Sequence, residues 1–433
     1  MKTLEEQKTA ELKDLKTLKG ITSGKFKHLQ KGTTEYFEKL AVMKEISEKI
    51  TAVEKEIKSI RHTSIASKHP EQPTSTSPFP QLDKNKYWGT DFEITLHSYN
   101  QVPEWNDFVA SNSAQLPSHN PAWINLIQTT FGHQSFILCA RTSTGKLVGG
   151  LPLTVFSSPL FGKFPVSMPY LNYGGPITEY YDVCMSLMQS LNGARKELDL
   201  KYIEIRSIYD DIQVDPSTKK ASMVLRLPND DVELDRILGS KVRAQYKRAE
   251  DYDPITKFGK IELLEDFYKV FSCNMRDLGT PVYSKKWFEN ILNNNKLDAH
   301  LIVIYVHNKP VSCGFLVNHG SLMEIPWAST LKSANKYNTN MWMYRKILSF
   351  AIQKGCKYFD FGRSTIEAGT YKFKKQWGAE PYQNYWYSIL PPDTPKPELN
   401  PDNPKLKLFI NIWKIMPVWI ANLIGPFIIK NIP

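Results

Sequence analysis

Apolar residues near the N-terminus recur with the period of a packed helix. They follow alternating three- and four-residue steps at Met43, Ile46, Ile50, Val53, Ile57 and Ile60. This is the spacing of a heptad seam, so residues 1–61 are predicted to form a helical coiled-coil hairpin. Residues 16–31 contain two glycines and no acidic residue, which marks a basic break or the tip of the hairpin. A coiled-coil dimer and an RNA-binding arm both stay open for this segment.

The helical period stops after residue 61. Residues 62–81 are rich in Ser, Thr and Pro and show no periodicity. Residues 62–87 are therefore predicted to be a linker, too polar to be buried.

From residue 88 onward a pattern of strands and helices occurs twice. Residues 201–207 (KYIEIRS) and 357–364 (KYFDFGRS) are near copies, and each follows an amphipathic helix. A strand-turn-strand pattern precedes each copy, at residues 136–156 and 301–320. This order is expected of an acetyltransferase-like (GNAT) sheet.

The repeat predicts the fold class. We expect an α/β (α+β) protein with two tandem GNAT-like domains, at residues 88–225 and 226–390, behind the N-terminal hairpin. Only the second copy continues into a helix that carries both lysines and aromatic residues. The second half is therefore expected to keep a site, and the first half to serve as scaffold.

Residues 391–433 begin as a proline-rich spacer and end as an apolar tail. Residues 405–433 hold four lysines and no acidic residue, and two prolines, Pro417 and Pro426, interrupt the apolar run. A spanning helix needs about 20 uninterrupted apolar residues, more than either segment offers. Tryptophans beside lysines are typical of a segment at a bilayer interface, so a membrane-surface tail is predicted. Packing of the tail on its own domains stays open.

The composition of the chain limits the kinds of ligand and partner that it can be expected to bind. The 433 residues carry a net charge of +11, which favours a polyanion such as nucleic acid, anionic lipid or a phosphorylated substrate. Five scattered cysteines without C-x-x-C, and nine histidines without H-x-x-x-H, speak against a disulfide framework and a metal site. The N-terminus lacks the apolar core of a signal peptide, so a cytosolic, reducing compartment is expected.

Several common ligand motifs are missing. The sequence has no phosphate loop of the form G-x-x-x-x-G-K-[ST], no G-x-G-x-x-G after a strand and no G-x-S-x-G elbow. The turn RSTIEAG (residues 363–369) is too poor in glycine to hold the pyrophosphate of coenzyme A on backbone amides. Coenzyme A is thus disfavoured, and no cofactor is assigned.

The most distinctive stretch is residues 359–381, FDFGRSTIEAGTYKFKKQWGAEP. Three lysines, Lys372, Lys374 and Lys375, stand among aromatic residues on a short helix. They are either an ordinary solvated face or a means of holding a negatively charged substrate.

Four stretches together resemble the FemAB family, and most of all its branch associated with exosortase (PEP-CTERM) and exopolysaccharide systems. They are NYGGP (172–176), KVRAQYKRAE (241–250), MRDLGTPVY (275–283) and FDFGRSTIEAGTYKFKKQWG (359–378). The resemblance spans roughly residues 92–390. It implies tandem GNAT-like domains that transfer amino acids from aminoacyl-tRNA to peptidoglycan precursors.

The resemblance also implies roles for particular residues. Phe373 and Lys374 match the family's Phe-Lys pair beside the acyl-transfer centre, where an ammonium would stabilise an oxyanion. Arg243 matches an arginine that grips the precursor's phosphate, although an exposed face paired with nearby acidic residues is the alternative. Tyr371 is assigned to substrate binding beside them.

Three further residues are predicted to line the cleft. Arg363 ends a buried strand at the edge where α/β folds place ligands, with a structural salt bridge to Asp360 or Glu367 as the alternative. Asn172 and Tyr173 precede two glycines that permit close backbone approach, unless that turn is purely structural.

These observations predict an acyl- or aminoacyltransferase that modifies a lipid-linked peptidoglycan or exopolysaccharide precursor. The expected partners are aminoacyl-tRNA or another acyl donor, a lipid-linked peptide or glycan acceptor, and the inner face of the cytoplasmic membrane, where the protein would be peripheral. The alternatives are a non-catalytic glycan-binding scaffold and a coenzyme A-dependent N-acyltransferase.

Overall fold

The computed structural model describes residues 4–26, 33–67, 77–158, 162–210, 215–392, 394 and 404–432. The chain divides into two compact units, Met1–Gln72 and Pro73–Pro433.

The first unit is a pair of helices, α1 (Leu4–Phe26) and α2 (Thr34–Ser67). Ile46, Ile50 and Val53 of the predicted seam are buried, and an ion pair of 2.8 Å joins Lys8 Nζ to Glu56 Oε2 across the two helices. The predicted N-terminal helices are thus confirmed, while dimerisation stays a prediction.

The ends of these helices differ from expectation. Helix α1 runs through Gly20 and Gly24, and the remaining part of the predicted tip, residues 27–31, lies outside the described residues. Helix α2 continues past the predicted end at residue 61 to Ser67. The first proline after residue 61 is Pro70, so residues 62–67 contain no strong helix breaker.

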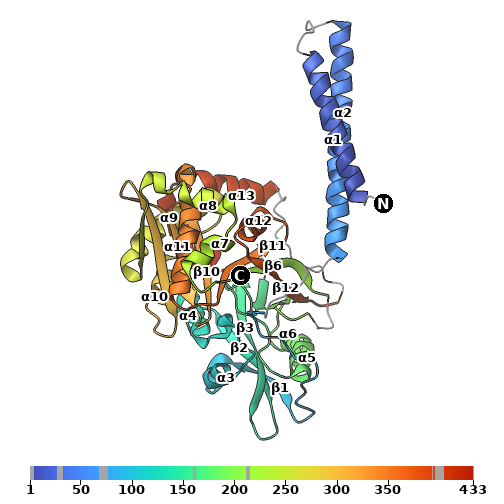
Figure 1. Ribbon diagram of the computed structural model, residues 1–433. Coiled ribbons are helices and arrows are strands. Elements are labelled where there is room, and N and C mark those ends of the chain that lie inside the picture. Colours follow the sequence, from blue (N-terminus) through green and yellow to red (C-terminus); the bar gives the residue numbers. More distant parts are fainter. Residues whose placement is uncertain are drawn as a thin grey trace. The chain divides into compact units, whose positions relative to one another are not determined.

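Among the residues that the structure describes, the second unit is built on one continuous sheet of 12 strands, in the order β1-β2-β3-β4-β5-β12-β6-β11-β10-β9-β8-β7. Figure 1 labels several of these strands, among them β6, β11 and β12. The first half of the chain supplies β1 (Glu93–Ser98), α3 (Trp105–Ser111), α4 (Pro121–Phe131), β2 (Gln134–Arg141), β3 (Leu147–Ser158), β4 (Gly162–Val166), α5 (Tyr181–Gln189), α6 (Leu191–Glu197), β5 (Ile203–Ser207) and β6 (Ser217–Arg226).

The second half repeats this order. After α7 (Asp231–Ile237) and α8 (Ser240–Lys247) it supplies β7 (Ile255–Gly259), α9 (Leu264–Leu278), α10 (Lys285–Leu292), β8 (Asp298–Val306), β9 (Lys309–Asn318), β10 (Leu322–Thr330), α11 (Thr339–Gln353), β11 (Tyr358–Thr365), α12 (Gly369–Lys375) and β12 (Glu380–Ile389). Helices α13 (Pro404–Ile415) and α14 (Val418–Ile429) follow.

The two halves exchange their last strands. Strand β6 of the first half pairs with β11, and strand β12 of the second half pairs with β5. The exchanged strands β6 and β12 also pair with each other, antiparallel, at the centre of the sheet. The duplicated units therefore share one sheet, and the predicted boundary at residues 225/226 falls at the end of β6.

Strands in the middle of each half are buried on both faces. In β8, Leu301, Val303 and Tyr305 face one core, whereas Ile302, Ile304 and Val306 face another. Helices α4, α9 and α10 cover the first of these faces, and α8, α11 and α12 the second. Burial on both faces explains why these strands are nearly uniformly apolar in sequence.

The C-terminal segment forms two helices. Pro417 precedes α14 at its N-cap, as expected of a helix-breaking residue, but Pro426 lies inside α14, which continues to Ile429. The predicted interruption at Pro426 is therefore wrong. Only the last turn follows this proline, so a single lost backbone hydrogen bond affects little of the helix.

Candidate functional site

The parallel strands β10 and β11 pair over only three positions, Leu322–Glu324 with Tyr358–Asp360, and then diverge. Each strand is irregular just beyond this point. In β10 the register shifts between Glu324 and Trp327, and in β11 between Asp360 and Arg363. Pro326, which has no N–H to donate, and Gly362, with φ of 77°, lie within these irregularities. The two bulges leave an opening between the strands.

A cavity of about 250 Å³ occupies this opening. Its polar lining side chains come from separate elements: Tyr170, Asn172, Tyr283, Glu324, Arg363 and Lys374. The two strands, helix α12 and loops of both halves thus meet around one small space.

Lys374 is the buried cation of the cavity. Its Nζ donates to the carbonyl oxygens of Gly362 at 2.8 Å and of Arg363 at 3.0 Å. Burial lowers the pKa of Lys374 to about 8, an effect that the negative Asp360 opposes and the positive Arg363 reinforces. Two of the three ammonium hydrogens are donated to these carbonyls, which leaves one for a ligand.

Two carboxyl groups lie next to each other across β10 and β11. Glu324 and Asp360 are register partners, and both are buried. Burial, and then the charge of Glu324, raise the pKa of Asp360 to about 7. Asp360 accepts the Gly362 N–H at 2.7 Å, while Glu324 lines the cavity with its Oε1 at 3.2 Å from His319 Nε2.

Arginines from the two copies of the repeated strand meet over one indole ring. The guanidinium carbons of Arg206 and Arg363 lie 4.7 and 5.0 Å from the ring centroid of Trp386 on β12. Burial and then the charge of Arg206 lower the pKa of Arg363, although an arginine stays protonated. Both arginines also lower the pKa of Lys220, for which burial is the larger cause. This cationic cluster, Arg206, Lys220 and Arg363, suits an anionic ligand group.

Comparisons with known proteins identify the fold that carries this cavity. Residues 239–383 match a family model described as "Acetyltransferase (GNAT) domain". The crystal structure of FemX aligns at a TM-score of 0.50 and 15% identity, over 69% of this chain and 97% of FemX. The chain has the tandem GNAT fold.

Two other structures align over similar lengths. The C-terminal domain of a putative lysylphosphatidylglycerol synthetase from Agrobacterium fabrum has a TM-score of 0.45 and 10% identity, over 68% of this chain and 92% of that one. A tandem GNAT protein from the clavulanic acid biosynthesis pathway has a TM-score of 0.43 and 9% identity, over 69% and 98%. No curated protein matches the sequence.

Within the tandem GNAT fold, α12 directs Lys374 and Lys372 to opposite environments. Lys374 is buried in the cavity beside Arg363, whereas the Lys372 side chain is 66% exposed and lies 3.7 Å from Glu367. Of the two alternatives left open for these lysines, Lys372 thus belongs to a solvated face, whereas Lys374 lies in the cavity.

The aromatic residues of α12 are placed differently from expectation. Tyr371 is buried in the core with Trp377, and Phe373 is half-buried against Tyr344, with ring centroids 5.2 Å apart. Neither Tyr371 nor Phe373 lines the cavity. The helix ends at Lys375, and Trp377 beyond it packs on the same Tyr344 ring, with centroids 5.9 Å apart.

The segment Asn172–Tyr173 packs against the second copy of the strand. The Asn172 amide oxygen lies 3.5 Å from the Arg363 backbone nitrogen, and Asn172 lines the cavity as predicted. Tyr173 does not line it; its ring is buried, and its hydroxyl lies 3.4 Å from an Asp360 carboxylate oxygen. Tyr173 therefore supports Asp360 from behind the cavity.

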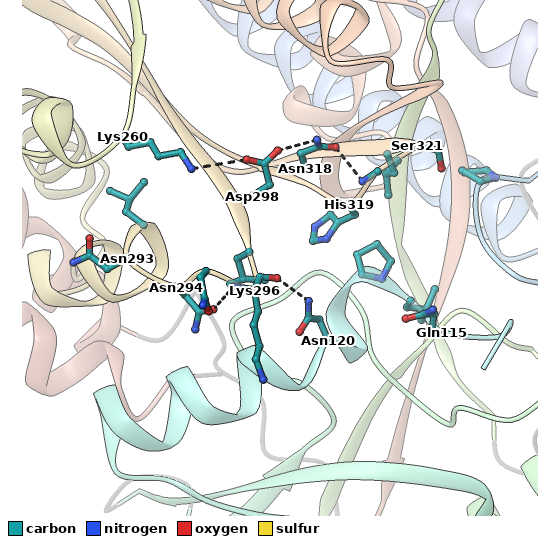
Figure 2. A pocket seen from close by; sticks show the side chains of 18 of the residues that line it. Gln115, Asn120, Lys260, Asn293, Asn294, Lys296, Asp298, Asn318, His319 and Ser321 are labelled. Carbon is teal, nitrogen blue, oxygen red and sulfur yellow. Dashed lines mark hydrogen bonds and ion pairs between the residues drawn. The ribbon is translucent and has the colours of Figure 1, made fainter. Parts of the chain in front are cut away.

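A larger cavity of about 710 Å³ lies where residues 115–120 of the first half face residues 292–298 and 318–322 of the second (Figure 2). Its lining is rich in amide side chains, among them Asn120, Asn294 and Asn318. His319 lines this cavity, and its partner Glu324 lines the smaller one. The His319–Glu324 pair thus has one member in the lining of each cavity.

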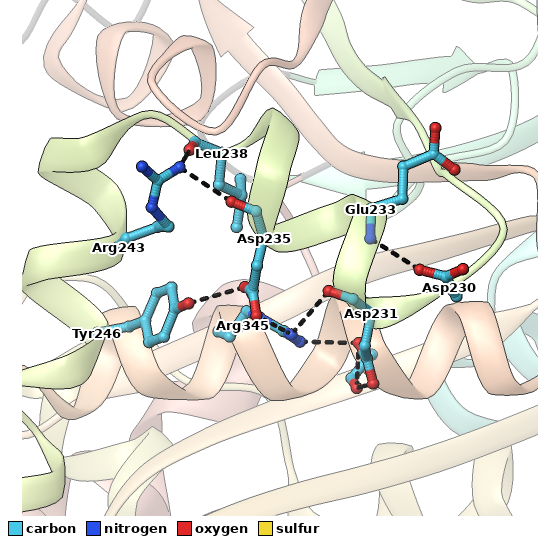
Figure 3. Close-up of polar contacts among 9 residues, drawn as sticks. Asp230, Asp231, Glu233, Asp235, Leu238, Arg243, Tyr246 and Arg345 are labelled. Carbon is cyan, nitrogen blue, oxygen red and sulfur yellow. Dashed lines mark hydrogen bonds and ion pairs between the residues drawn. The ribbon is translucent and has the colours of Figure 1, made fainter.

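Arg243 lies on α8, away from both cavities. Its Nη1 donates to the backbone carbonyls of Asp235, at 3.0 Å, and of Leu238, at the end of α7 (Figure 3). Arg345 holds the same helix to α11 through Asp231 and Asp235. The observed contacts of Arg243 therefore stabilise the end of a helix, and its predicted grip on a phosphate stays a proposal.

The tandem GNAT fold raises the question of coenzyme A. The turn considered from the sequence, RSTIEAG (residues 363–369), leads from β11 into α12. The turn at the open end of β10, which leads into α11, is residues 331–338, LKSANKYN, and it contains no glycine. Without glycine the backbone amides lack the close approach that a pyrophosphate requires. The residues of this turn therefore do not fit coenzyme A. Among the described residues, no cluster of His, Cys, Asp and Glu could hold a metal ion.

Glu324 and Tyr283 line the cavity but were not predicted from the sequence. A usable signal existed for Glu324, because SLMEIPW places one carboxylate in an otherwise apolar strand. Tyr283 gave no such signal, since its place in the cavity depends on how the loop after α9 folds back.

Proposed function

We propose that this chain is an acyl- or aminoacyltransferase that modifies a lipid-linked precursor of the cell envelope. One observation carries the proposal: a lysine ammonium, a carboxylate and an arginine converge in the opening between β10 and β11. The tandem GNAT fold, with FemX among its structural neighbours, supports acyl transfer as the reaction class.

The groups of the cavity have complementary roles in such a reaction. An amine or hydroxyl of the acceptor attacks the carbonyl carbon of the donor ester, and Glu324 accepts the proton that the nucleophile loses. The carbonyl oxygen becomes an oxyanion, which the remaining N–H of Lys374 stabilises. The donor's C–O bond then breaks, and the proton held by Glu324 passes to the leaving oxygen.

Aminoacyl-tRNA is the donor that the charges favour. The acceptor end of a tRNA brings phosphates to the ester, and Arg363 of the cationic cluster lines the same cavity as Lys374. Within that cluster, Arg206 is 2% exposed; its Nε is paired with Glu204 Oε1 at 3.0 Å, and its Nη1 has no hydrogen-bond partner among the described residues. The resemblance of the sequence motifs to the FemAB family implies the same donor.

The larger cavity is proposed to receive the acceptor. Amide side chains donate and accept hydrogen bonds without a net charge, which suits the hydroxyl and amide groups of a glycan or peptide. The acceptor's lipid would keep the enzyme at the inner face of the cytoplasmic membrane.

Labelled donors test this proposal. The purified full-length protein is incubated with an isolated membrane fraction and either radiolabelled aminoacyl-tRNA or radiolabelled acetyl-coenzyme A, and label in extracted lipid-linked material is counted. We expect transfer from aminoacyl-tRNA, and a fall of about a hundredfold in Glu324→Gln because the base is lost.

Two outcomes would contradict the proposal. Transfer from acetyl-coenzyme A alone would make the protein an ordinary acyltransferase. Retention of glycan without transfer from either donor would make it a binding scaffold.

A further inference from the structure

The C-terminal helices α13 and α14 pack on helix α9 with one face only. Trp413 of α13 and Ala421, Gly425 and Ile429 of α14 are buried. The fit is close, because a Cβ added to Gly425 would lie 2.9 Å from the Val282 nitrogen. Packing of the tail on its own domain, one of the two alternatives left by the sequence, thus accounts for the inner face.

The outer face of the same helices is apolar and exposed. On α13, Leu408, Ile412 and Ile415 are 61%, 49% and 81% exposed. On α14, Trp419, Leu423 and Phe427 are 69%, 62% and 67% exposed. Steps of three and four residues place each set on one side of its helix. We call these six side chains the outer stripe.

The stripe gathers six large exposed apolar side chains on two consecutive helices. Isolated exposed apolar side chains are normal on a protein, whereas a contiguous set on adjoining helices marks an interaction site. Residues 404–432 contain four lysines and no acidic residue, and Lys414 is exposed, with its Cε near Gly279 at the end of α9. Large apolar groups beside lysines match an anionic bilayer surface, in which apolar groups enter the acyl boundary and lysines meet lipid phosphates.

We propose that the outer stripe docks the protein in the plane of an anionic membrane. No helix among the described residues is long and apolar enough to cross a bilayer. Helices of 12 residues each, already packed on α9, can instead lie in the interface while their inner faces stay on the protein.

The docking helices also contact the residues of the small cavity. Tyr170, which lines the cavity, donates its hydroxyl hydrogen to the Lys430 carbonyl at 2.8 Å. Gly425 packs on Val282, the neighbour of the cavity-lining Tyr283. Membrane docking would therefore hold the cavity next to the lipid surface. The choice of a membrane as partner rests on the proposed lipid-linked acceptor.

Vesicle flotation of the full-length protein tests the docking surface without any substrate. Vesicles of phosphatidylcholine mixed with phosphatidylglycerol are compared with vesicles of phosphatidylcholine alone. We expect binding to the anionic vesicles that weakens with salt, and a drop of about a hundredfold in Trp419→Ser/Leu423→Ser/Phe427→Ser. Lys414→Gln should weaken binding by about fivefold.

The matched control lies on the opposite face of the sheet. Val232 and Ile237 on α7 are 81% and 51% exposed, and Val232→Ser/Ile237→Ser should bind vesicles as the parent does. Because the altered side chains of the triple variant are exposed, its thermal unfolding should match that of the parent.

Equal flotation of the triple variant and the parent would overturn the proposal. The proposal would also be overturned if the parent did not bind vesicles but sedimented as a dimer, and the triple variant sedimented as a monomer. The stripe would then bind a second copy of the chain. Neither result depends on transfer, so failure of the docking surface is distinguishable from failure of the proposed reaction.

Discussion

Lys374 owes its chemical character to its surroundings on β11 and α12. Burial lowers its pKa to about 8, while two backbone carbonyls keep the ammonium in place. Such a lysine is charged at neutral pH, yet it is held in a medium where its charge acts strongly on a developing oxyanion.

The lowered pKa of Lys374 predicts a pH dependence. The ammonium is present below its pKa and lost above it, so initial transfer rates should fall as pH rises through about 8. In Lys374→Arg, which stays protonated, any residual activity should lack this falling limb. Rates are measured on intact donor at each pH, because esters hydrolyse in base. An unchanged falling limb in the arginine variant would assign the titration to another group.

Part of the site is predictable from the sequence. Arg363 and Asn172 are predicted from their strand and turn positions, Lys374 is assigned through the resemblance to the FemAB family, and all three line the cavity. Glu324 was missed because one carboxylate in a strand usually faces solvent, and its burial depends on β11 packing beside β10. Tyr371 and Tyr173 were assigned to the site but are buried behind it, which the sequence of a short helix or turn does not determine.

At the scale of elements, the opening of the sheet depends on a bulge in β11. Gly362 occupies the positive-φ position of this bulge, and its carbonyl accepts from Lys374. The first copy of the strand, KYIEIRS, has no glycine at this point. Gly362 is therefore a difference between the two copies of the repeated strand, and it lies in the copy that lines the small cavity.

The variant Gly362→Ala tests the role of this bulge, and Gly355→Ala is its matched control. Both glycines have φ of 77°, so each substitution should cost about 1–2 kcal/mol in the free energy of unfolding. Only Gly362→Ala should also lower transfer, because Gly362 positions Lys374 whereas nothing lies within 4 Å of a Cβ at Gly355. Urea unfolding and initial rates check the two parts. If both variants transferred at the same rate, the bulge would have no role in the reaction.

Helix α12 gives a second prediction at this scale. Phe373 is only half-buried, so Phe373→Ala should lower the free energy of unfolding by about 1–2 kcal/mol. Trp377 is fully buried, so Trp377→Ala should lower it by about 3–5 kcal/mol. Urea unfolding measures the free energy of unfolding of the two variants. If the two variants lost equal stability, Phe373 would be packed more deeply than its exposure indicates.

The whole molecule combines features that the sequence predicted with one that it did not. Near copies of a strand-turn-strand, a helix and a strand were enough to predict two tandem units, because local patterning survives duplication. The exchange of β6 and β12 was not predictable, since it pairs residues more than 100 positions apart and leaves no periodic signal.

The N-terminal unit carries the prediction about the donor. Residues 16–31 have no acidic residue, so tRNA should bind in a salt-sensitive manner and more weakly when residues 1–72, the first compact unit, are removed. Filter binding at several salt concentrations measures the affinity and its salt slope. A truncated protein with unchanged affinity and slope would assign tRNA binding to the second unit alone.

Mass spectrometry of envelope polymers tests the central claim most directly, that transfer occurs beside Lys374. A deletion strain is complemented with the parent, with Lys374→Met or with Lys372→Met, whose side chain is exposed on the same helix. The account predicts a modified polymer with the parent and Lys372→Met, and a loss of about a hundredfold with Lys374→Met at equal protein level. Full modification with Lys374→Met, or its loss with Lys372→Met instead, would contradict the account.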